Sequence, residues 1–224
     1  MSTIMGLPNG SLRYLKIENA RLVQENDEMR QELATLQQSV RALSSLYHLS
    51  EKITPTLDVL HLVREILDTA LVVLKSTDGT IMLADEKTGE LVFTVVRGEA
   101  AERLQGYRLP PGRGIAGWVA LYRRPQIVRD VRSDPRFFAD IDQRFGFNTR
   151  SMVCVPIYLD DGRLLGVVEV LNKIGDRDFS DDDLALLLIV AQLAATAMRR
   201  AERALELADR EKQRAALSST HNLK

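Results

Sequence analysis

The sequence predicts an α+β fold with an antiparallel sheet, helices on one face of that sheet and a shorter covering segment on the other. The stretch 151–171 contains two runs of β-branched residues separated by Asp161-Gly162, a pair that is typical of tight hairpin turns. Both runs are apolar at successive positions, which indicates strands buried on both faces. Helical patterns at 57–74 and from Asp181 onward supply helices for one face.

Composition and charge exclude several classes of function. With 224 residues, of which 45% are hydrophobic, the chain fits one domain with appendages. Lys plus Arg (30) nearly balance Asp plus Glu (31), so nothing favours nucleic acid or an anionic membrane as a partner. A single cysteine, Cys154, excludes an internal disulfide and a multi-thiol metal site. There is no signal-peptide pattern, and the longest apolar run, Leu184–Met198, is short for a bilayer, so we expect a cytoplasmic protein without a cofactor.

A heptad repeat near the N-terminus predicts a coiled coil. Position a holds Leu12, Asn19, Asn26, Leu33, Val40 and Tyr47, and position d holds Leu15, Leu22, Met29, Leu36 and Leu43. Because a buried Asn at a pairs with its symmetry mate, Asn19 and Asn26 favour a parallel homodimer. Glu25 and Arg30 lie at g and e, where they can pair between chains. Residues 1–53 are therefore assigned to a tail and a dimeric coiled coil.

A central domain, 54–200, begins where Thr54-Pro55 breaks the first helix and Thr56 can cap the next. A first hairpin is expected from strands at 80–84 and 91–96, joined by a turn that contains Gly89. The helix that leaves the domain carries a second pair of heptad seams, which continue into 201–224. These seams are Leu184, Ala191, Met198 and Leu205, and Leu187, Ala194, Ala201 and Ala208.

A glycine-rich segment lies between the two hairpins and supplies the cover. Short helices are expected at 114–121 and 136–144, with a short extended segment at 126–128 between them. The glycine spacing matches dinucleotide and kinase loops, but no apolar strand precedes it, so both readings are rejected. A glycine loop that feeds a helix offers free backbone N–H groups to an anion. A plain turn with a packing role is the alternative.

Two groups of carboxylates carry further expectations. Glu169 lies inside an apolar strand, so it either sits at a sheet edge or faces a polar pocket, and we favour the pocket. The acidic run that ends at Asp183 lacks the glycine and glutamate of a calcium loop. Ser180 and Asp183 instead form a capping-box pair at a helix start. The histidines, at 48, 61 and 221, form no triad or metal cluster.

With these residues in place, the chain resembles a GAF domain of the cyclic-nucleotide-binding branch found in phosphodiesterases and some adenylyl cyclases. The resemblance covers about 57–200 and is densest over 113–120, 145–157 and 164–183. The signature of that branch is matched by Asn172, Lys173, Phe179 and Asp183, while its final Glu is replaced by Leu184. The resemblance implies a pocket closed by an ion pair between Lys173 and Asp183.

The resemblance also implies ligand contacts. It assigns the phosphate to backbone groups of Ile115 and Ala116, and it places Thr149 and Glu169 along the pocket. Arg97 stands where several cGMP-binding members have Asp, so the base preference between cAMP and cGMP is open.

The expected function is that of a homodimeric sensor, not an enzyme. A small ligand, cAMP or cGMP, would order the cover, and the coiled coils would pass the signal to an output carried by this or a separate protein. The alternative is a dimerisation scaffold whose core binds a protein partner or no ligand. One cysteine is too few for the methionine sulfoxide reductases of the family, and its mid-strand position does not suit attachment of a bilin.

Overall fold

The computed structural model describes residues 16–27, 30, 59–175 and 177–221, and of 214–221 it describes the backbone alone. The chain divides into two units, 1–41 and 42–224. In the first unit, residues 16–27 are helical, and Leu22, at a predicted d position, is 53% exposed. The other predicted seam residues of the first unit are Asn19 and Asn26, which are described, and Leu12, Leu15, Met29, Leu33, Leu36 and Val40, which lie outside the described residues.

The second unit is built on a six-stranded antiparallel sheet with the strand order β3-β2-β1-β6-β5-β4. The strands are β1 (Asp78–Ala84), β2 (Leu91–Arg97), β3 (Arg108–Leu109), β4 (Gln126–Val128), β5 (Met152–Tyr158) and β6 (Leu164–Leu171). The predicted hairpin, β5 and β6, therefore lies inside the sheet. Its strand β6 pairs with β5 on one side and with β1 on the other.

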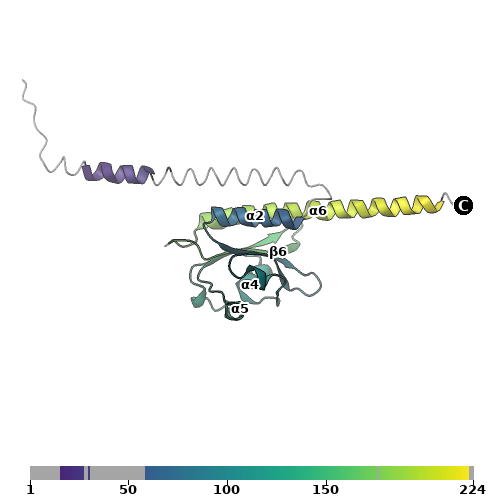
Figure 1. The fold of residues 1–224 in the computed structure, drawn as a ribbon, viewed down its shortest axis with the longest axis horizontal. Helices are drawn as coiled ribbons and strands as arrows, with labels where there is room; N and C mark the ends of the chain where they lie inside the picture. The colour runs from purple at the N-terminus through teal and green to yellow at the C-terminus, as the bar shows by residue number, and fades with distance from the viewer. Residues whose placement is uncertain (1–15, 28–29, 31–58, 176, 222–224) are drawn as a thin grey trace, which may run out of the picture. The chain divides into compact units, whose positions relative to one another are not determined.

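Two long helices cover one face of the sheet. They are α2 (Val59–Val73) and α6 (Asp181–His221), which lie along the same side of the sheet in Figure 1. Their apolar stripes pack on alternate residues of the central strands, such as Val153, Val155, Val168 and Val170. This layer is the larger of the two cores, and it contains the apolar stripe of α2, as expected for a helix at 57–74 that lies on the sheet.

Shorter elements cover the opposite face, which carries α4 and α5 in Figure 1. They are α3 (Ala101–Leu104), α4 (Gly114–Tyr122), the 3-10 helix η1 (Val131–Ser133) and α5 (Ala139–Phe145). A second hydrophobic core fills the space beneath them and includes Ile115, Val119, Cys154 and Val167. The predicted two-sided cover of the sheet is thus confirmed.

Several boundaries differ from those expected. The second cover helix, α5, starts at Ala139 and not near Arg136, because 135–138 forms a turn held by the Asp134 side chain. The elements α3, β3 and η1 were not expected, since each has at most four residues and carries no periodicity of its own. The predicted cap at Thr56 lies outside the described residues.

Ion pairs fasten α6 to the turn between β5 and β6. Arg163 donates to Glu202 on α6 and, at 3.0 Å, to Glu86 in the turn between β1 and β2. Arg199 on α6 donates to Asp160 in the turn between β5 and β6. These contacts hold α6 at the point where its burial ends.

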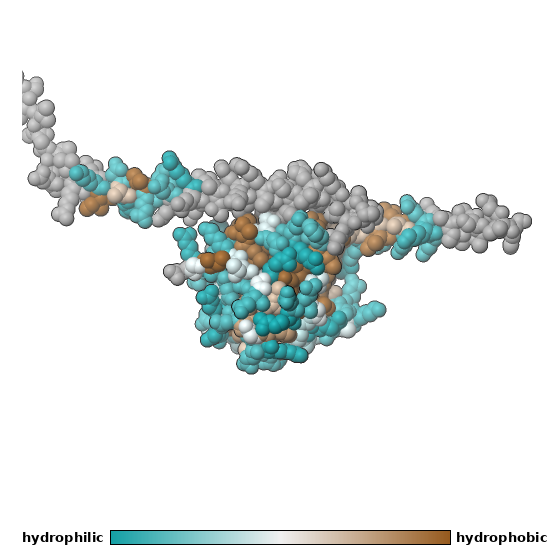
Figure 2. Space-filling view, in the orientation of Figure 1, coloured by the Kyte–Doolittle hydropathy of each residue, from teal (hydrophilic) through white to brown (hydrophobic). Residues whose placement is uncertain are grey.

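Beyond these contacts α6 carries exposed apolar side chains. Leu205 is 61% exposed and Leu207 is 58% exposed, and Figure 2 shows hydrophobic surface on the part of the helix that leaves the sheet. Among the described residues, α6 is also the one helix long and apolar enough to cross a membrane, although 44% of its most apolar window is buried in the domain. A core helix has the same composition, so this is weak evidence for a span.

Candidate functional site

The signature residues meet where β6 passes into α6. The Lys173 ammonium donates to the Asp183 carboxylate, and the two side chains are 13% and 9% exposed. Ser180 donates to the same carboxylate from its backbone N–H at 2.8 Å and from its hydroxyl at 3.1 Å, while Asp183 N–H points back to Ser180 Oγ at 3.3 Å. This reciprocal arrangement is the predicted capping box. The ring of Phe179, which is 1% exposed, lies 5.5 Å from the Lys173 ammonium.

Asn172 ties the end of β6 to the loop that precedes β5. Its side-chain amide donates to the Asn148 carbonyl at 3.0 Å, and its side-chain oxygen accepts from Arg150 N–H at 2.7 Å. Its backbone adopts φ of 54°, a left-handed conformation that Asn tolerates better than most residues. The side chain therefore positions this loop.

Glu169 lies at the centre of the sheet and faces the cover. It is 6% exposed, and its cross-strand neighbours are Thr80 on β1 and Cys154 on β5. Since β6 is a central strand, the edge alternative is wrong. Burial raises the pKa of Glu169 to about 7, and a hydrogen bond with the Cys154 thiol acts in the opposite direction. Burial also raises the pKa of that thiol.

Thr149 is held by a carboxylate from α5. Its hydroxyl donates to Asp142 Oδ1 at 2.8 Å, and its backbone N–H donates to Asp142 Oδ2 at 2.7 Å. Thr149 itself is 5% exposed. The pair joins α5 to the loop that leads into β5, so polar contacts as well as packing connect the cover to this part of the chain.

Ile115 and Ala116 lie in the first turn of α4, and both side chains are buried against the sheet. Among the residues that the structure describes, no side chain caps this helix start, whose N-cap is Arg113. Gly117 is required here, because a Cβ on it would lie 2.6 Å from the carbonyl carbon of Gly112. The glycine loop is thus packed closely against the helix that it starts.

Arg97 lies on the other face of the sheet from Ile115, Ala116 and Glu169. Its guanidinium binds Asp68 on α2, with Nη2 3.0 Å from Oδ2, on the helix-covered face of the sheet. The cause is a bulge opposite Ile81-Met82, which places Phe93 in the cover core but Val95 in the helix core. A bulge shifts every later side chain to the other face, so the expectation that Arg97 faces the ligand is corrected.

Two cavities are lined by residues of α4 and of the loops around the sheet. One, of about 330 Å³, lies between α4 and residues 135–138. The other, of about 360 Å³, is lined by Asp78, Gly98, Glu99, Arg150 and Asn172, among others. Glu169 and Thr149 line neither of these two cavities, and both residues are buried.

Sequence reasoning missed the residues that hold the site together. Asp142 and Asn148 are ordinary polar residues of a short helix and a loop, and their partners are known only once the chain is folded. The arginines and aromatic residues beside α4 were also missed, although the spacing of Arg113 and Trp118 around the glycines is visible in the sequence. Within the described part of the chain, no group of three His, Cys, Asp or Glu side chains could hold a metal ion.

The family comparison agrees with this geometry. Residues 56–199 match the family model of the GAF domain. This match covers more than half of the chain, which therefore belongs to the GAF domain family.

Two similar proteins are phosphodiesterases. Over 96 residues, or 42% of this chain, it is 32% identical to the dual 3',5'-cyclic-AMP and -GMP phosphodiesterase 11A of Takifugu rubripes. Over 170 residues, or 70% of this chain, it is 26% identical to the dual 3',5'-cyclic-AMP and -GMP phosphodiesterase 11 of Drosophila melanogaster. The matches span 11% and 12% of those relatives, so they concern a small part of each.

Solved structures share the fold. The GAF domain of a phosphoenolpyruvate-protein phosphotransferase from Coxiella burnetii aligns with a TM-score of 0.64 at 17% identity, covering 74% of this chain and 95% of that one. The free methionine-R-sulfoxide reductase from Neisseria meningitidis aligns with a TM-score of 0.61 at 21% identity, covering 74% and 91%. At such identities the likeness establishes the GAF fold alone.

Proposed function

We propose that this chain is a regulatory GAF sensor that binds a cyclic nucleotide, cAMP or cGMP, beneath its cover. The observation that carries the proposal is the bond between Lys173 and Asp183, which joins the end of β6 to the start of α6. The similarity to two cyclic nucleotide phosphodiesterases supports the choice of ligand class. The ligand region comprises the first turn of α4 with Ile115 and Ala116, together with Thr149 and Glu169. Its role is regulatory and not catalytic, and its proposed location is the cytoplasm.

Signal transfer in this proposal uses helices. Asp183 belongs both to the closing ion pair and to the first turn of α6, so ligand binding changes the restraint on that helix. A ligand shifts such an equilibrium only by its differential affinity for the two states. The heptad seams and the exposed Leu22, Leu205 and Leu207 support a parallel homodimer that passes the change to an output domain or protein.

A thermal melt with and without cAMP and cGMP tests the proposal. Ligand at about 100 times its Kd stabilises the native state by about 2.7 kcal/mol, a shift on the order of 5 to 10 °C for a chain of this size. A shift with one nucleotide assigns the base preference, and Lys173→Ala is expected to weaken that binding. If neither nucleotide shifts the melt, and mass spectrometry of the denatured protein finds no resident ligand, the sensor is excluded.

A second candidate is a dimerisation scaffold that binds a protein or nothing. The burial of Glu169 favours it, because this residue is 6% exposed and lines neither of the two cavities described above. The same melt decides between the candidates, since a scaffold is indifferent to both nucleotides.

A further inference from the structure

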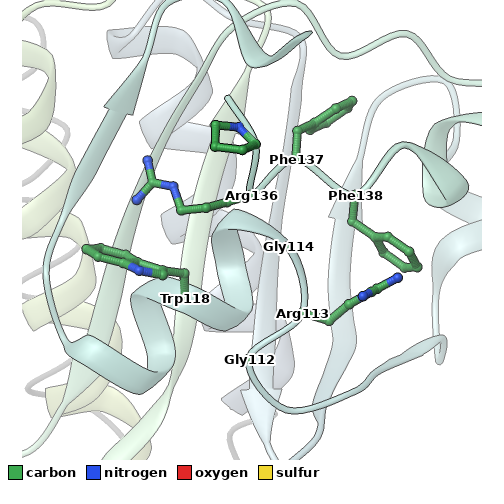
Figure 3. A pocket seen from close by; sticks show the side chains of 8 residues that line it. Gly112, Arg113, Gly114, Trp118, Arg136, Phe137 and Phe138 are labelled. Carbon is green, nitrogen blue, oxygen red and sulfur yellow. The ribbon is translucent and has the colours of Figure 1, made fainter. Parts of the chain in front are cut away.

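A cavity on the outer side of α4 has the composition of an anion-binding site. Its volume of about 330 Å³ lies at the lower end of the range for small-molecule sites. Residues 112–114 and Trp118 form one side, and residues 135–138 form the other (Figure 3). The lining contains two arginines and three aromatic residues but no carboxylate.

Arg113 supplies the positive charge. Its guanidinium lies over the Phe138 ring, 4.3 Å from the ring centroid, and Figure 3 shows the two side chains together. Within the described part of the chain, no residue forms an ion pair with this guanidinium or accepts a hydrogen bond from it. Stacking fixes the plane of the group and leaves its N–H donors available for a bidentate anion.

Arg136, which also lines the cavity, is held in place by its neighbours. It lies 4.6 Å from the centroid of the Trp118 ring (Figure 3). Asp134 accepts from it at 2.6 and 2.9 Å, and Gln126 accepts at 3.0 Å. Because Asp134 already balances the charge of Arg136, Arg113 is the main partner for an incoming anion.

We propose that this cavity binds a small organic anion in which a carboxylate or a phosphate is attached to a planar ring. Arg113 binds the anionic oxygens, and the ring packs among Trp118 and the phenylalanines. The cavity adjoins the proposed nucleotide region, because Gly114, which lines the cavity, begins the turn of α4 that contains Ile115 and Ala116. The face of α4 that carries Ile115 and Ala116 is buried against the sheet, whereas Gly114 and Trp118 line the cavity.

The chain carries its own reporter for this site, because Trp118 is its only tryptophan. We would titrate the full chain with phenyl phosphate, benzoate and inorganic phosphate while recording tryptophan fluorescence. Saturable changes are expected with the two ring-bearing anions, and the tighter of the two identifies the preferred anion. No saturable change with either up to about 10 mM, where even a millimolar site is filled, would overturn the proposal.

Paired arginine variants separate specific binding from a general charge effect. Arg113→Gln removes the charged guanidinium and is expected to weaken binding at least about tenfold, since hydrogen bonds to charged groups are among the stronger ones. Arg124→Gln removes the same charge from an exposed residue that does not line the cavity and should leave binding unchanged. Equal weakening by both variants contradicts the proposal, and so does inorganic phosphate that binds as tightly as phenyl phosphate.

Discussion

Glu169 and Cys154 are cross-strand partners whose buried side chains meet on the covered face of the sheet. The thiol hydrogen bonds to the carboxylate, yet burial dominates and raises the pKa of Glu169 to about 7. A carboxyl group with this pKa is partly protonated near neutral pH. The centre of the proposed ligand region therefore changes charge in the physiological range.

The first prediction is a pH-dependent stability that originates at Glu169. The folded carboxyl holds its proton more tightly than the unfolded one, whose pKa is near 4.5. Its stabilising contribution is therefore complete below pH 4.5 and is lost as the pH rises to about 7. Over that window the free energy of unfolding should fall by about 3 kcal/mol relative to Glu169→Gln.

Urea unfolding of both proteins across that pH window measures this difference. Glu169→Gln keeps the shape of the side chain and removes its titration, so it is the matched control. Parallel pH profiles for the two proteins would show that Glu169 titrates normally and would refute the prediction.

The second prediction concerns the ion pair of Lys173 and Asp183. Lys173→Met keeps the length of the side chain but leaves the carboxylate with only its Ser180 donors. The expected loss of stability is about 2 kcal/mol, as for hydrogen bonds to charged groups. Lys87→Met, at an exposed turn position, should change stability by less than about 0.5 kcal/mol in the same urea experiment. Similar losses in both variants would rule out a special role for the pair.

The third prediction concerns Asp142, which accepts two hydrogen bonds from Thr149. Thr149→Val removes one bond and should cost about 1 kcal/mol. Asp142→Ala removes both and leaves a buried N–H without its acceptor, so it should cost clearly more. Chemical denaturation ranks the two variants, and the reverse order would contradict the geometry.

The fourth prediction concerns Gly117. Its Cβ would lie 2.6 Å from a backbone atom of Gly112, so Gly117→Ala must displace the glycine loop. We expect a loss of about 1 to 3 kcal/mol, as for other overpacked sites. Gly106→Ala is the comparison, because a Cβ there meets nothing within 4 Å and the cost is only that of its φ of 83°. A thermal melt in which Gly117→Ala matches the wild type would contradict the close packing.

The sequence predicted the sheet and the helix-covered face because their signals are local. Runs of β-branched and apolar residues, together with turn residues, identified β1, β2, β5 and β6, and the apolar stripe identified α2. Ser180 and Asp183 were paired correctly because a capping box depends on spacing along one helix start. The approach of Lys173 to Asp183 followed from the family resemblance and not from the pattern.

The remaining features depend on contacts between distant segments. Nothing in the sequence marks the bulge that turns Arg97 toward Asp68, since the extra residue, Thr94, is a common strand residue. The burial of Glu169 depends on how the short helices of the cover pack on the sheet. The cavity between Arg113 and Arg136 exists only because residues 135–138 return to α4.

The ion pair of Asp183 and the ion pair of Glu202, both on α6, differ in their sensitivity to salt. Asp183 and Glu202 are 19 positions apart, or about 28 Å along the helix at 1.5 Å per residue. At the near end, the bond of Lys173 with Asp183 is largely shielded from ions. At the far end, Arg163 and Glu202 are 40% and 43% exposed, where mobile ions screen attraction effectively. Rising ionic strength therefore loosens the distal part of α6 first, while its first turn stays attached to the sheet.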